Sequence, residues 1–214
     1  MAALLVTLSC EQRPVICLDP GHTSENGSGT RGKKLTELGV AWRVACLLKP
    51  LLEADGYDVV LTKTSQGEKV TNRQRADIAN KAGAALLLRL HCDAGSGTGF
   101  ASYYPSQQGK NGKDRGPSAD VIRASSAAIR KFHPAVAKVL IGKLRDAGLK
   151  TDLQTKIGGQ QGALTGSIMS HVPVILVEMC VLMNSHDEAF LLNGGEKTLA
   201  EALQAGVRAA VPRG

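Results

Sequence analysis

The segment Val15-Ile-Cys-Leu-Asp-Pro-Gly-His22 decides the fold. Its first four residues are an apolar run that Asp19-Pro20-Gly21 ends, which is typical of a buried strand entering a turn. A helix is predicted next, because Thr36 is placed to cap its N-terminus and apolar residues then recur with the 3.6-residue period of a helix packed on one face. Gly56 ends that helix. The chain therefore opens with a strand followed by a helix.

The alternation of strands and helices continues from residue 57. Strands are predicted at residues 57–62 and 84–91, with a helix around residues 70–82 between them. The strand at 84–91 is apolar on both faces and is expected at the centre of the sheet. Short connections between alternating elements favour parallel strands with right-handed crossovers in a single α/β domain. The remaining predictions are an edge strand at 99–104, a functional loop at 105–117, a helix at 121–147 interrupted near Pro134, a Gly/Gln-rich loop at 158–162, a buried strand at 172–178, and helices at 186–192 and 196–210.

The chain is basic, and the sign of its charge limits the classes of partner. It has 214 residues, and 26 Lys and Arg against 19 Asp and Glu give a formal net charge of +7. Nucleic acid, an anionic membrane surface and an acidic polymer all match such a charge. Aromatic residues make up only 3% of the chain, which disfavours recognition of nucleic acid by base stacking. No stretch is long and apolar enough for a transmembrane segment.

Residues 1–13 form an N-terminal segment ahead of the predicted catalytic domain, which covers residues 14–214. Residues 1–10 are apolar, but they lack the basic start of a signal peptide and are too short to cross a bilayer. They fit the remnant of an export signal, a lipoprotein cleavage site before Cys10, or an edge strand. The residue pattern leaves these three interpretations open.

Residues that can bind a metal or move a proton lie at the ends of the predicted strands. These are His22 after the first strand, Glu37 at the start of the first helix, His91 at the end of the third strand and Glu178 at the end of the strand at 172–178. In an open α/β sheet, the carboxyl ends of the strands meet at the edge where ligands bind. Two imidazoles and one carboxylate are the minimum set for a catalytic zinc ion, with water in the fourth position. A further carboxylate is then needed as general base, and partial burial suits Glu178 to that task.

Other roles are open to the same residues. A His at a strand end is often a hydrogen-bonded structural residue, Glu37 in a first helical turn is favoured by the helix dipole, and Glu178 could pair with a Lys or Arg. Two His and one carboxylate are also the facial triad of non-haem iron oxygenases. Spacing alone therefore leaves a zinc enzyme, a non-haem iron enzyme and a structural cluster as alternatives.

Four segments in order resemble the motifs of the zinc-dependent N-acetylmuramoyl-L-alanine amidases of the amidase-3 family. They are Val15–His22, Thr36-Glu37 with the helix that follows, residues 71–94, and residues 172–184. The resemblance implies one zinc ion per chain, held by His22, Glu37 and His91, with Glu178 as the catalytic carboxylate. It also implies a twisted, mixed but mostly parallel sheet of about six strands flanked by helices.

The resemblance further implies an activity and a partner. The enzyme would hydrolyse the amide between N-acetylmuramic acid and L-alanine in peptidoglycan, whose free carboxylates suit a chain of net charge +7. Nucleic acid is then not needed to explain the charge. We expect a monomer, exported to the periplasm or cell wall of a bacterium. The alternative is a module that binds peptidoglycan without cleaving it.

The chain departs from the family's pattern at two places near the expected ligands. Thr23-Ser24 stand where glycines usually follow the first His, and Glu25 is a rival to Glu37 as the carboxylate ligand or a candidate for substrate binding. Arg89 takes a strand position that is usually small or apolar, so it needs an acidic partner if it is buried.

Three further residues near the expected site receive predictions. Asp19 and Asp93 are expected to orient a metal-bound His or to contact substrate, with capping of the turn as the alternative for Asp19. Cys92 should point to the opposite face of its strand from His91, because side chains alternate along a strand. We therefore do not expect Cys92 to be a ligand.

Overall fold

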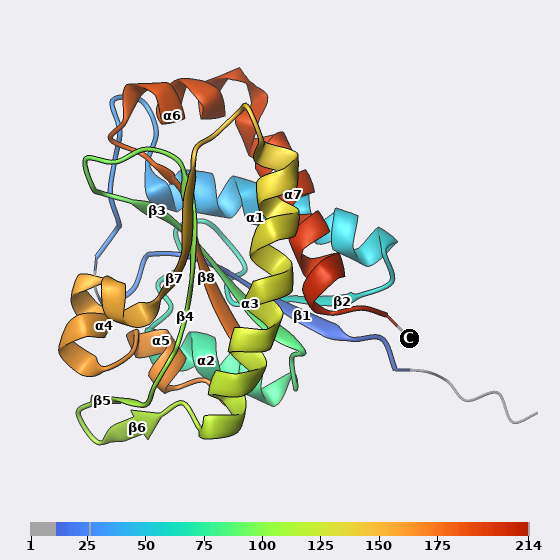
Figure 1. The fold of residues 1–214 in the computed structure, drawn as a ribbon, viewed down its shortest axis with the longest axis vertical. Helices are drawn as coiled ribbons and strands as arrows, with labels where there is room; N and C mark the ends of the chain where they lie inside the picture. The colour runs from blue at the N-terminus through green and yellow to red at the C-terminus, as the bar shows by residue number, and fades with distance from the viewer. Residues whose placement is uncertain (1–11, 26, 214) are drawn as a thin grey trace, which may run out of the picture.

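The computed structural model describes residues 12–25 and 27–213, which fold into a six-stranded sheet between helices (Figure 1). The strands of this sheet are β1 (Val15–Pro20), β2 (Asp58–Leu61), β3 (Leu86–Asp93), β4 (Phe100–Tyr104), β7 (Asp146–Thr151) and β8 (Val174–Val181). The α-helices are α1 (Glu37–Ala54), α2 (Asn72–Lys81), α3 (Ala119–Leu140), α4 (Lys156–Gln161), α5 (Thr165–Ile168), α6 (Ser185–Phe190) and α7 (Glu196–Ala210). A small hairpin of β5 (Gly109–Asn111) and β6 (Asp114–Gly116) stands apart from the main sheet.

The last strand in the chain lies inside the sheet. The strand order is β2-β1-β3-β8-β4-β7, so β8 separates β3 from β4. The first four strands of this order are parallel to one another, whereas β4 runs antiparallel to β8 and parallel to β7. The predicted fold class, a mixed but mostly parallel sheet flanked by helices, is confirmed. The central position predicted for the strand at 84–91 is confirmed as well.

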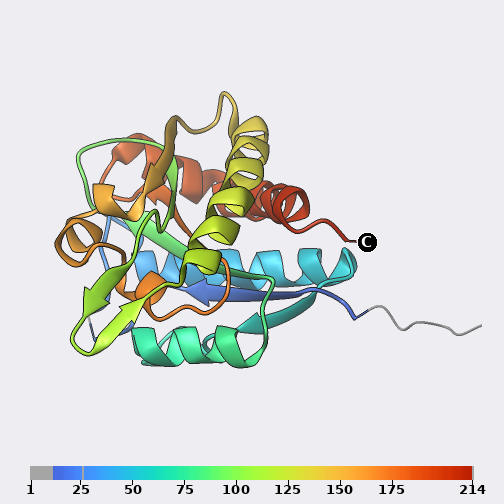
Figure 2. The same ribbon diagram turned by 60° about the horizontal axis from the view of Figure 1, so that its bottom comes forward.

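Alternation along the strands divides the side chains between two helical layers. Ile16 and Leu18 join the main core, which packs against α1, α3 and α7, whereas Cys17 faces the opposite side with Ala79 of α2. Figure 2 shows α1 and α2 on opposite sides of β1. The face of the sheet towards α2 therefore also receives the side chain of Asp19, two residues after Cys17.

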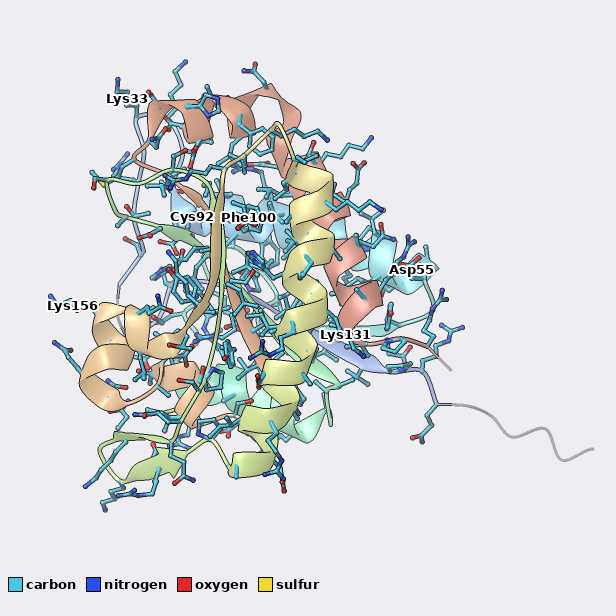
Figure 3. The ribbon with its side chains drawn as sticks, viewed as in Figure 1. Lys33, Asp55, Cys92, Phe100, Lys131 and Lys156 are labelled. Atoms are coloured by element: carbon cyan, nitrogen blue, oxygen red, sulfur yellow. The ribbon has the colours of Figure 1, made fainter. Side chains whose placement is uncertain are left out.

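The interior of the α1 layer is apolar up to the ends of the strands. Cys92 of β3 and Phe100 of β4 are 3% and 1% exposed, and Figure 3 shows both inside the molecule, whereas Lys33 and Lys156 lie at its periphery. Burial of these side chains on the core face leaves their chain neighbours pointing to the other face. Cys92 accordingly points away from His91, as predicted.

The structure corrects the prediction of an edge strand at residues 99–104. β4 is an inner strand, because β7 covers it on the side away from β8. β7 itself lies in and just beyond the region predicted as a helix up to residue 147. The helix ends earlier, at Leu140, where Gly142 adopts a φ of +72° that a helix does not contain. Pro134, in contrast, lies inside α3 and does not end it.

Two segments predicted as loops contain regular structure. Residues 105–117 include the β5–β6 hairpin, which packs against α5, and residues 158–162 fall largely within α4. Glycine allows the close packing at both places. A Cβ added at Gly116 would lie 2.2 Å from the carbonyl oxygen of Ile168, and one at Gly158 would lie 1.8 Å from that of Asp152. These glycines thus serve close backbone approach rather than a flexible loop.

Among the residues described, no helix combines the length and apolar character needed to cross a membrane. Of the predicted N-terminal segment, residues 1–11 lie outside the described part of the chain.

Candidate metal centre

His22 lies just beyond the end of β1, in a backbone conformation that side-chain-bearing residues seldom adopt. Its φ is +57°, and such residues are concentrated at functional sites. The Nδ1 atom of His22 lies 3.1 Å from the carbonyl oxygen of Gly27, so Nδ1–H donates a hydrogen bond there. That bond leaves Nε2 as the nitrogen with a free electron pair, which is the form in which imidazole binds a metal.

Glu37 is the first residue of α1, whose N-cap is Thr36. It is 4% exposed, and its Oε1 atom lies 2.9 Å from His91 Nδ1 and 3.1 Å from His22 Nε2. The other carboxylate oxygen accepts a hydrogen bond of 2.8 Å from the Thr30 amide. Burial alone would raise the pKa of Glu37, but the neighbouring imidazoles of His22 and His91 hold it well below its usual range. The carboxylate is therefore ionised at neutral pH.

His91 and Glu178 are directly opposite each other on the neighbouring strands β3 and β8. Burial lowers the pKa of His91, which keeps the imidazole neutral, as a metal ligand must be. Burial also raises the pKa of Glu178 well above its ordinary value, and the nearby charges of Glu37 and Asp93 add to that rise. Within the described chain, His91 Nε2 and Glu178 Oε2 are buried polar atoms that have no hydrogen-bond partner.

These distances bring three of the expected ligands together. His22, Glu37 and His91 offer ligand atoms that all lie within 4.8 Å of one another. Two imidazoles and an ionised carboxylate are the donor set of a catalytic zinc site with an open position. The atoms that converge are His22 Nε2 and His91 Nδ1, since both lie within 3.1 Å of Glu37 Oε1. The residues present therefore fit a zinc ion.

Asp19 does not contact either imidazole, contrary to its expected role in orienting a metal-bound His. Instead it is fully buried and accepts hydrogen bonds from Thr62, Arg75 and Arg89. Arg75 in turn donates to the carbonyl oxygens of His22 and Thr23, each at 3.1 Å. Asp19 thus acts on His22 indirectly, because it positions Arg75, and Arg75 holds the backbone of the His22 turn.

A buried lysine reinforces the same turn. Lys63 is 1% exposed, and its ammonium group donates hydrogen bonds of 2.6 Å to the carbonyl oxygens of His22 and Gln66. Burial lowers the pKa of Lys63 to about 8. The carbonyl of His22 therefore receives two cationic donors, one from Arg75 and one from Lys63, which fix the direction of the imidazole.

The far end of the loop is held by the C-terminal part of the chain. Glu188 of α6 accepts hydrogen bonds of 2.7 and 2.9 Å from the amides of Lys34 and Leu35. Between the two anchors, Gly29 packs so closely on the site that an added Cβ would lie 2.6 Å from both Glu37 Oε2 and His22 Cδ2. The polypeptide is therefore anchored at His22 and at Lys34 and Leu35, and Gly29 packs closely on the site.

The other predicted site residues lie outside the cluster. Glu25 accepts hydrogen bonds from the amide and side chain of Asn72, and it is not among the three clustered ligands. Asp93 accepts a hydrogen bond from the Gly95 amide and makes no hydrogen bond to His91 within the described chain. Its negative charge nevertheless raises the pKa of Glu178.

The supporting residues Arg75, Lys63 and Glu188 were not predicted from the sequence. Arg75 and Lys63 occur in polar segments, where a charged side chain is normally exposed. The signal that could have revealed them was Asp19 at the end of an apolar strand. A carboxylate that is buried there requires cationic partners.

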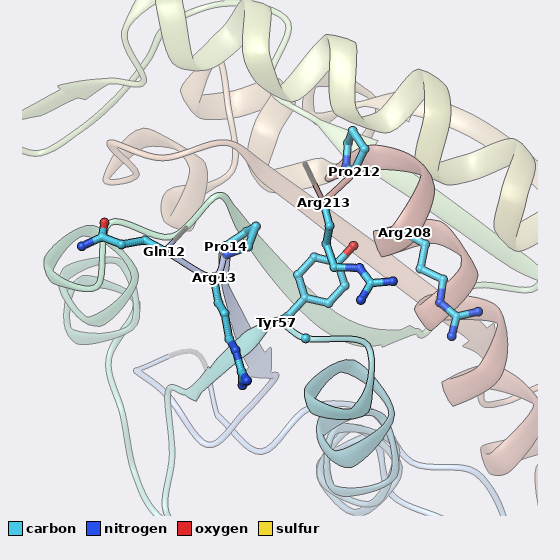
Figure 4. Close-up of a pocket in the computed structure, with 8 residues that line it drawn as sticks. Gln12, Arg13, Pro14, Tyr57, Arg208, Pro212 and Arg213 are labelled. Atoms are coloured by element: carbon cyan, nitrogen blue, oxygen red, sulfur yellow. The ribbon is translucent and has the colours of Figure 1, made fainter. Parts of the chain in front are cut away.

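A cavity of about 240 Å³ opens at the cluster and is bordered by His22, His91, Glu178, Arg89 and Leu176, among others. A larger cavity of about 780 Å³ lies elsewhere, around Tyr57 and three arginines (Figure 4). There, Arg208 is paired with Asp55 and Arg213 lies over the Tyr57 ring. That larger cavity contains no metal-binding set or general base, so the chemistry belongs to the smaller one.

Comparison with known proteins gives matches along most of the chain. The family model described as N-acetylmuramoyl-L-alanine amidase matches residues 16–209. A sporulation-specific N-acetylmuramoyl-L-alanine amidase of Bacillus subtilis is 37% identical over 93 residues, which span 42% of this chain and 36% of that relative. The chain therefore matches only about a third of that relative's length.

Two solved structures share the fold. The N-acetylmuramoyl-L-alanine amidase AmiC2 of Nostoc punctiforme superposes with a TM-score of 0.73 at 19% identity, covering 94% of this chain and 98% of that one. The amidase Ami1 from Mycobacterium smegmatis also gives 0.73, at 20% identity, covering 91% and 94% of the two chains.

Proposed function

The chain belongs to the family of N-acetylmuramoyl-L-alanine amidases, and we propose that it hydrolyses the amide between N-acetylmuramic acid and L-alanine in peptidoglycan. In this proposal His22, Glu37 and His91 hold one zinc ion, and Glu178 is the catalytic carboxylate. When bound there, zinc lowers the pKa of a coordinated water and polarises a carbonyl group.

The observation that supports this function best is the pair of buried atoms without partners on β3 and β8. His91 Nε2 and Glu178 Oε2 are opposite each other in the sheet. His91 is a proposed metal ligand and Glu178 is the proposed proton acceptor, and both residues border the same cavity. A structural cluster would satisfy these atoms internally, so their lack of partners favours a site that metal and substrate complete.

Glu178 supplies the proton transfers that amide hydrolysis requires. Its carboxylate takes a proton from the attacking water and then gives it to the leaving nitrogen of L-alanine. Burial suits the carboxyl to both steps, because a raised pKa makes it a stronger base and then a donor at neutral pH. Arg75 and Lys63 keep the His22 turn in place during these steps through its backbone carbonyl.

The surroundings of this activity follow from its substrate. We propose that residues 14–214 act as a monomeric catalytic unit, since one chain supplies every residue of the site. Peptidoglycan lies outside the bacterial cytoplasmic membrane, so the unit would act after export. The net charge of +7 would attract the carboxylates of the polymer.

Two variants of the purified protein and one control variant test the proposal. Metal analysis should find about one zinc ion per chain, and the protein should release stem peptides that begin with L-alanine from peptidoglycan. Glu178→Gln should abolish release while keeping the zinc. Glu37→Ala should lose the zinc, whereas Glu25→Ala serves as the matched control and should retain it. Release that persists after complete chelation would refute the metal mechanism, and activity restored by ferrous iron with oxygen alone would identify an iron enzyme instead.

A further inference from the structure

Arg89 lies two residues before the proposed metal ligand His91 on β3, on the same face of the sheet. His91 pairs with Glu178 across β3 and β8, and two residues earlier Arg89 pairs with Leu176. Side chains two residues apart on a strand point to the same face and are separated by roughly 7 Å. Arg89 and Leu176 border the same cavity as His91 and Glu178. The deeper part of that cavity therefore presents a guanidinium group.

Two nitrogens of this guanidinium are committed to the protein. The Nε atom donates to Asp19 Oδ2 at 2.8 Å, and Nη2 donates to Asn72 Oδ1 at 2.7 Å. The third nitrogen, Nη1, donates to no residue in the described part of the chain. A Cβ added at Gly166 would lie only 2.2 Å from Nη1, so this nitrogen packs against α5 at a position where only glycine leaves room for it.

The charge around Arg89 is also incompletely balanced. Asp19, which is fully buried, is shared between Arg89 and Arg75, which are 5% and 2% exposed. The buried triad therefore carries one positive charge in excess. Asp152 and Glu178 also interact with Arg89, but within the described chain its guanidinium donates hydrogen bonds to Asp19 and Asn72 and to neither of these two carboxyl groups. A buried cation that lacks a full counter-charge is costly unless an anion completes the site.

We propose that Arg89 is a specificity-determining residue that binds a carboxylate of the substrate peptide, on the second residue after the scissile amide. This inference rests on the proposed amidase function. An extended peptide advances about 3.3–3.6 Å per residue, so a carboxylate on the second residue lies roughly 7 Å from the scissile carbonyl. The spacing between His91 and Arg89 along β3 is the same. Guanidinium groups bind carboxylates with directional, charge-assisted hydrogen bonds.

A matched pair of substrates tests the assignment. The probes are N-acetylmuramoyl-L-alanyl-D-isoglutamate, with its α-carboxylate free, and the same compound with that carboxylate converted to a carboxamide. The zinc-loaded protein should prefer the free acid in kcat/KM by about tenfold or more, mainly through KM, because a charge-assisted hydrogen bond is lost with the amide. Arg89→Gln should bring the ratio close to one, and Arg89→Lys, the charge-retaining control, should keep part of it.

A purely structural role of Arg89 would change the rates with both probes but not their ratio. If Arg89→Gln lowers the rates with both probes equally and leaves their ratio intact, or if the parent protein has no preference, the proposal is wrong. Should Arg89→Gln fail to fold, Gly166→Ala provides the same test, because its Cβ would lie 2.2 Å from Nη1 and 2.5 Å from Cζ and so displaces the guanidinium group. The acid-over-amide ratio should fall in that variant too, and an unchanged ratio would overturn the proposal.

Calorimetric binding of the two probes separates this inference from the amidase function. Zinc-loaded Glu178→Gln should bind the acid more tightly than the amide by the same factor of about ten. Preference in binding without cleavage by the parent protein would support Arg89 and refute the amidase function. Cleavage of both probes without preference would refute Arg89 and support the function.

Discussion

Asp19→Asn tests how much the metal-site scaffold depends on one buried charge. Asp19 is fully buried and receives hydrogen bonds from two buried guanidinium groups, those of Arg75 and Arg89. Asparagine has nearly the same shape and keeps one carbonyl acceptor. The substitution therefore removes the negative charge with little change in packing, and it leaves two cations inside the protein without an anionic partner.

The expected loss of stability follows from that arrangement. Removal of one partner of a buried ion pair costs about 3–5 kcal/mol, and the remaining amide acceptor offsets about 1 kcal/mol of this. We therefore expect the free energy of unfolding to fall by about 3 kcal/mol. In a chain of this size, each kcal/mol corresponds to roughly 2–4 °C in Tm, so Tm should fall by about 6–12 °C.

The pH dependence of the same effect has a definite sign. Burial would raise the pKa of Asp19, but Arg89 and Arg75 hold it well below its ordinary value of 3.8. A depressed pKa in the folded state contributes stability that is fully present above the unfolded value and is lost as pH falls through the folded value. The difference in stability between the parent and Asp19→Asn should therefore be constant from neutral pH to about pH 5 and shrink steadily in stronger acid.

Urea unfolding provides the measurement, with circular dichroism and the fluorescence of the single tryptophan, Trp42, as two independent probes. Asp55→Asn is the matched control, because Asp55 also binds an arginine, but the side chain of that partner, Arg208, is 53% exposed. We expect the control to lose at most about 1 kcal/mol. Asp19 does not stabilise the scaffold by its charge if Asp19→Asn lowers the free energy of unfolding no more than Asp55→Asn does. The same conclusion follows if the difference in stability between the parent and Asp19→Asn does not shrink in acid.

Three further predictions concern the metal loop and the metal itself. Gly29→Ala should weaken zinc binding strongly, because its Cβ would enter the site. Gly27→Ala is the control: its φ is similarly positive, but no atom lies within 4 Å of the added Cβ, so its effect on zinc affinity should be much smaller. Equal losses of affinity in a zinc titration would contradict this prediction. Glu188→Ala should reduce zinc affinity about tenfold by releasing the far end of the loop, while Glu201→Ala on the exposed surface of α7 should leave the affinity unchanged. Chelation should lower Tm, since a metal at a hundred times its Kd stabilises the folded state by about 2.7 kcal/mol; an unchanged Tm would mean that no metal is bound in the folded protein.

The strands β1, β3 and β8 could be predicted because they are largely apolar. Each contains a polar residue near its carboxyl end, namely Asp19, His91 and Glu178. β7 has no such pattern, because residues 146–151 are partly exposed and pair with a strand on one side only. Its strand conformation depends on its ladder with β4, which no local pattern contains. The β5–β6 hairpin depends in the same way on contact with α5.

The expected metal ligands lie at the positions where topology and sequence act together. Parallel strands bring their carboxyl ends to one edge, so residues that end β1 and β3 had to approach each other. The residues that hold the His22 turn could not be found in that way. Arg75 lies on a helix of mostly polar residues, yet it is 2% exposed, because it inserts below the turn and reaches Asp19 from the side of the sheet. Only the tertiary fold brings these groups together.

The position of β8 also has a consequence in time. During synthesis, β3 and β4 leave the ribosome long before Val174–Val181, the strand that must lie between them. Until β8 arrives, the growing chain exposes the unpaired backbone edges of both strands, which makes it prone to pair with other chains. The same order delays assembly of the proposed site, because Glu178 and the loop anchor Glu188 follow His22, Glu37 and His91 by many residues in the chain. The proposed site therefore cannot form until synthesis has passed α6.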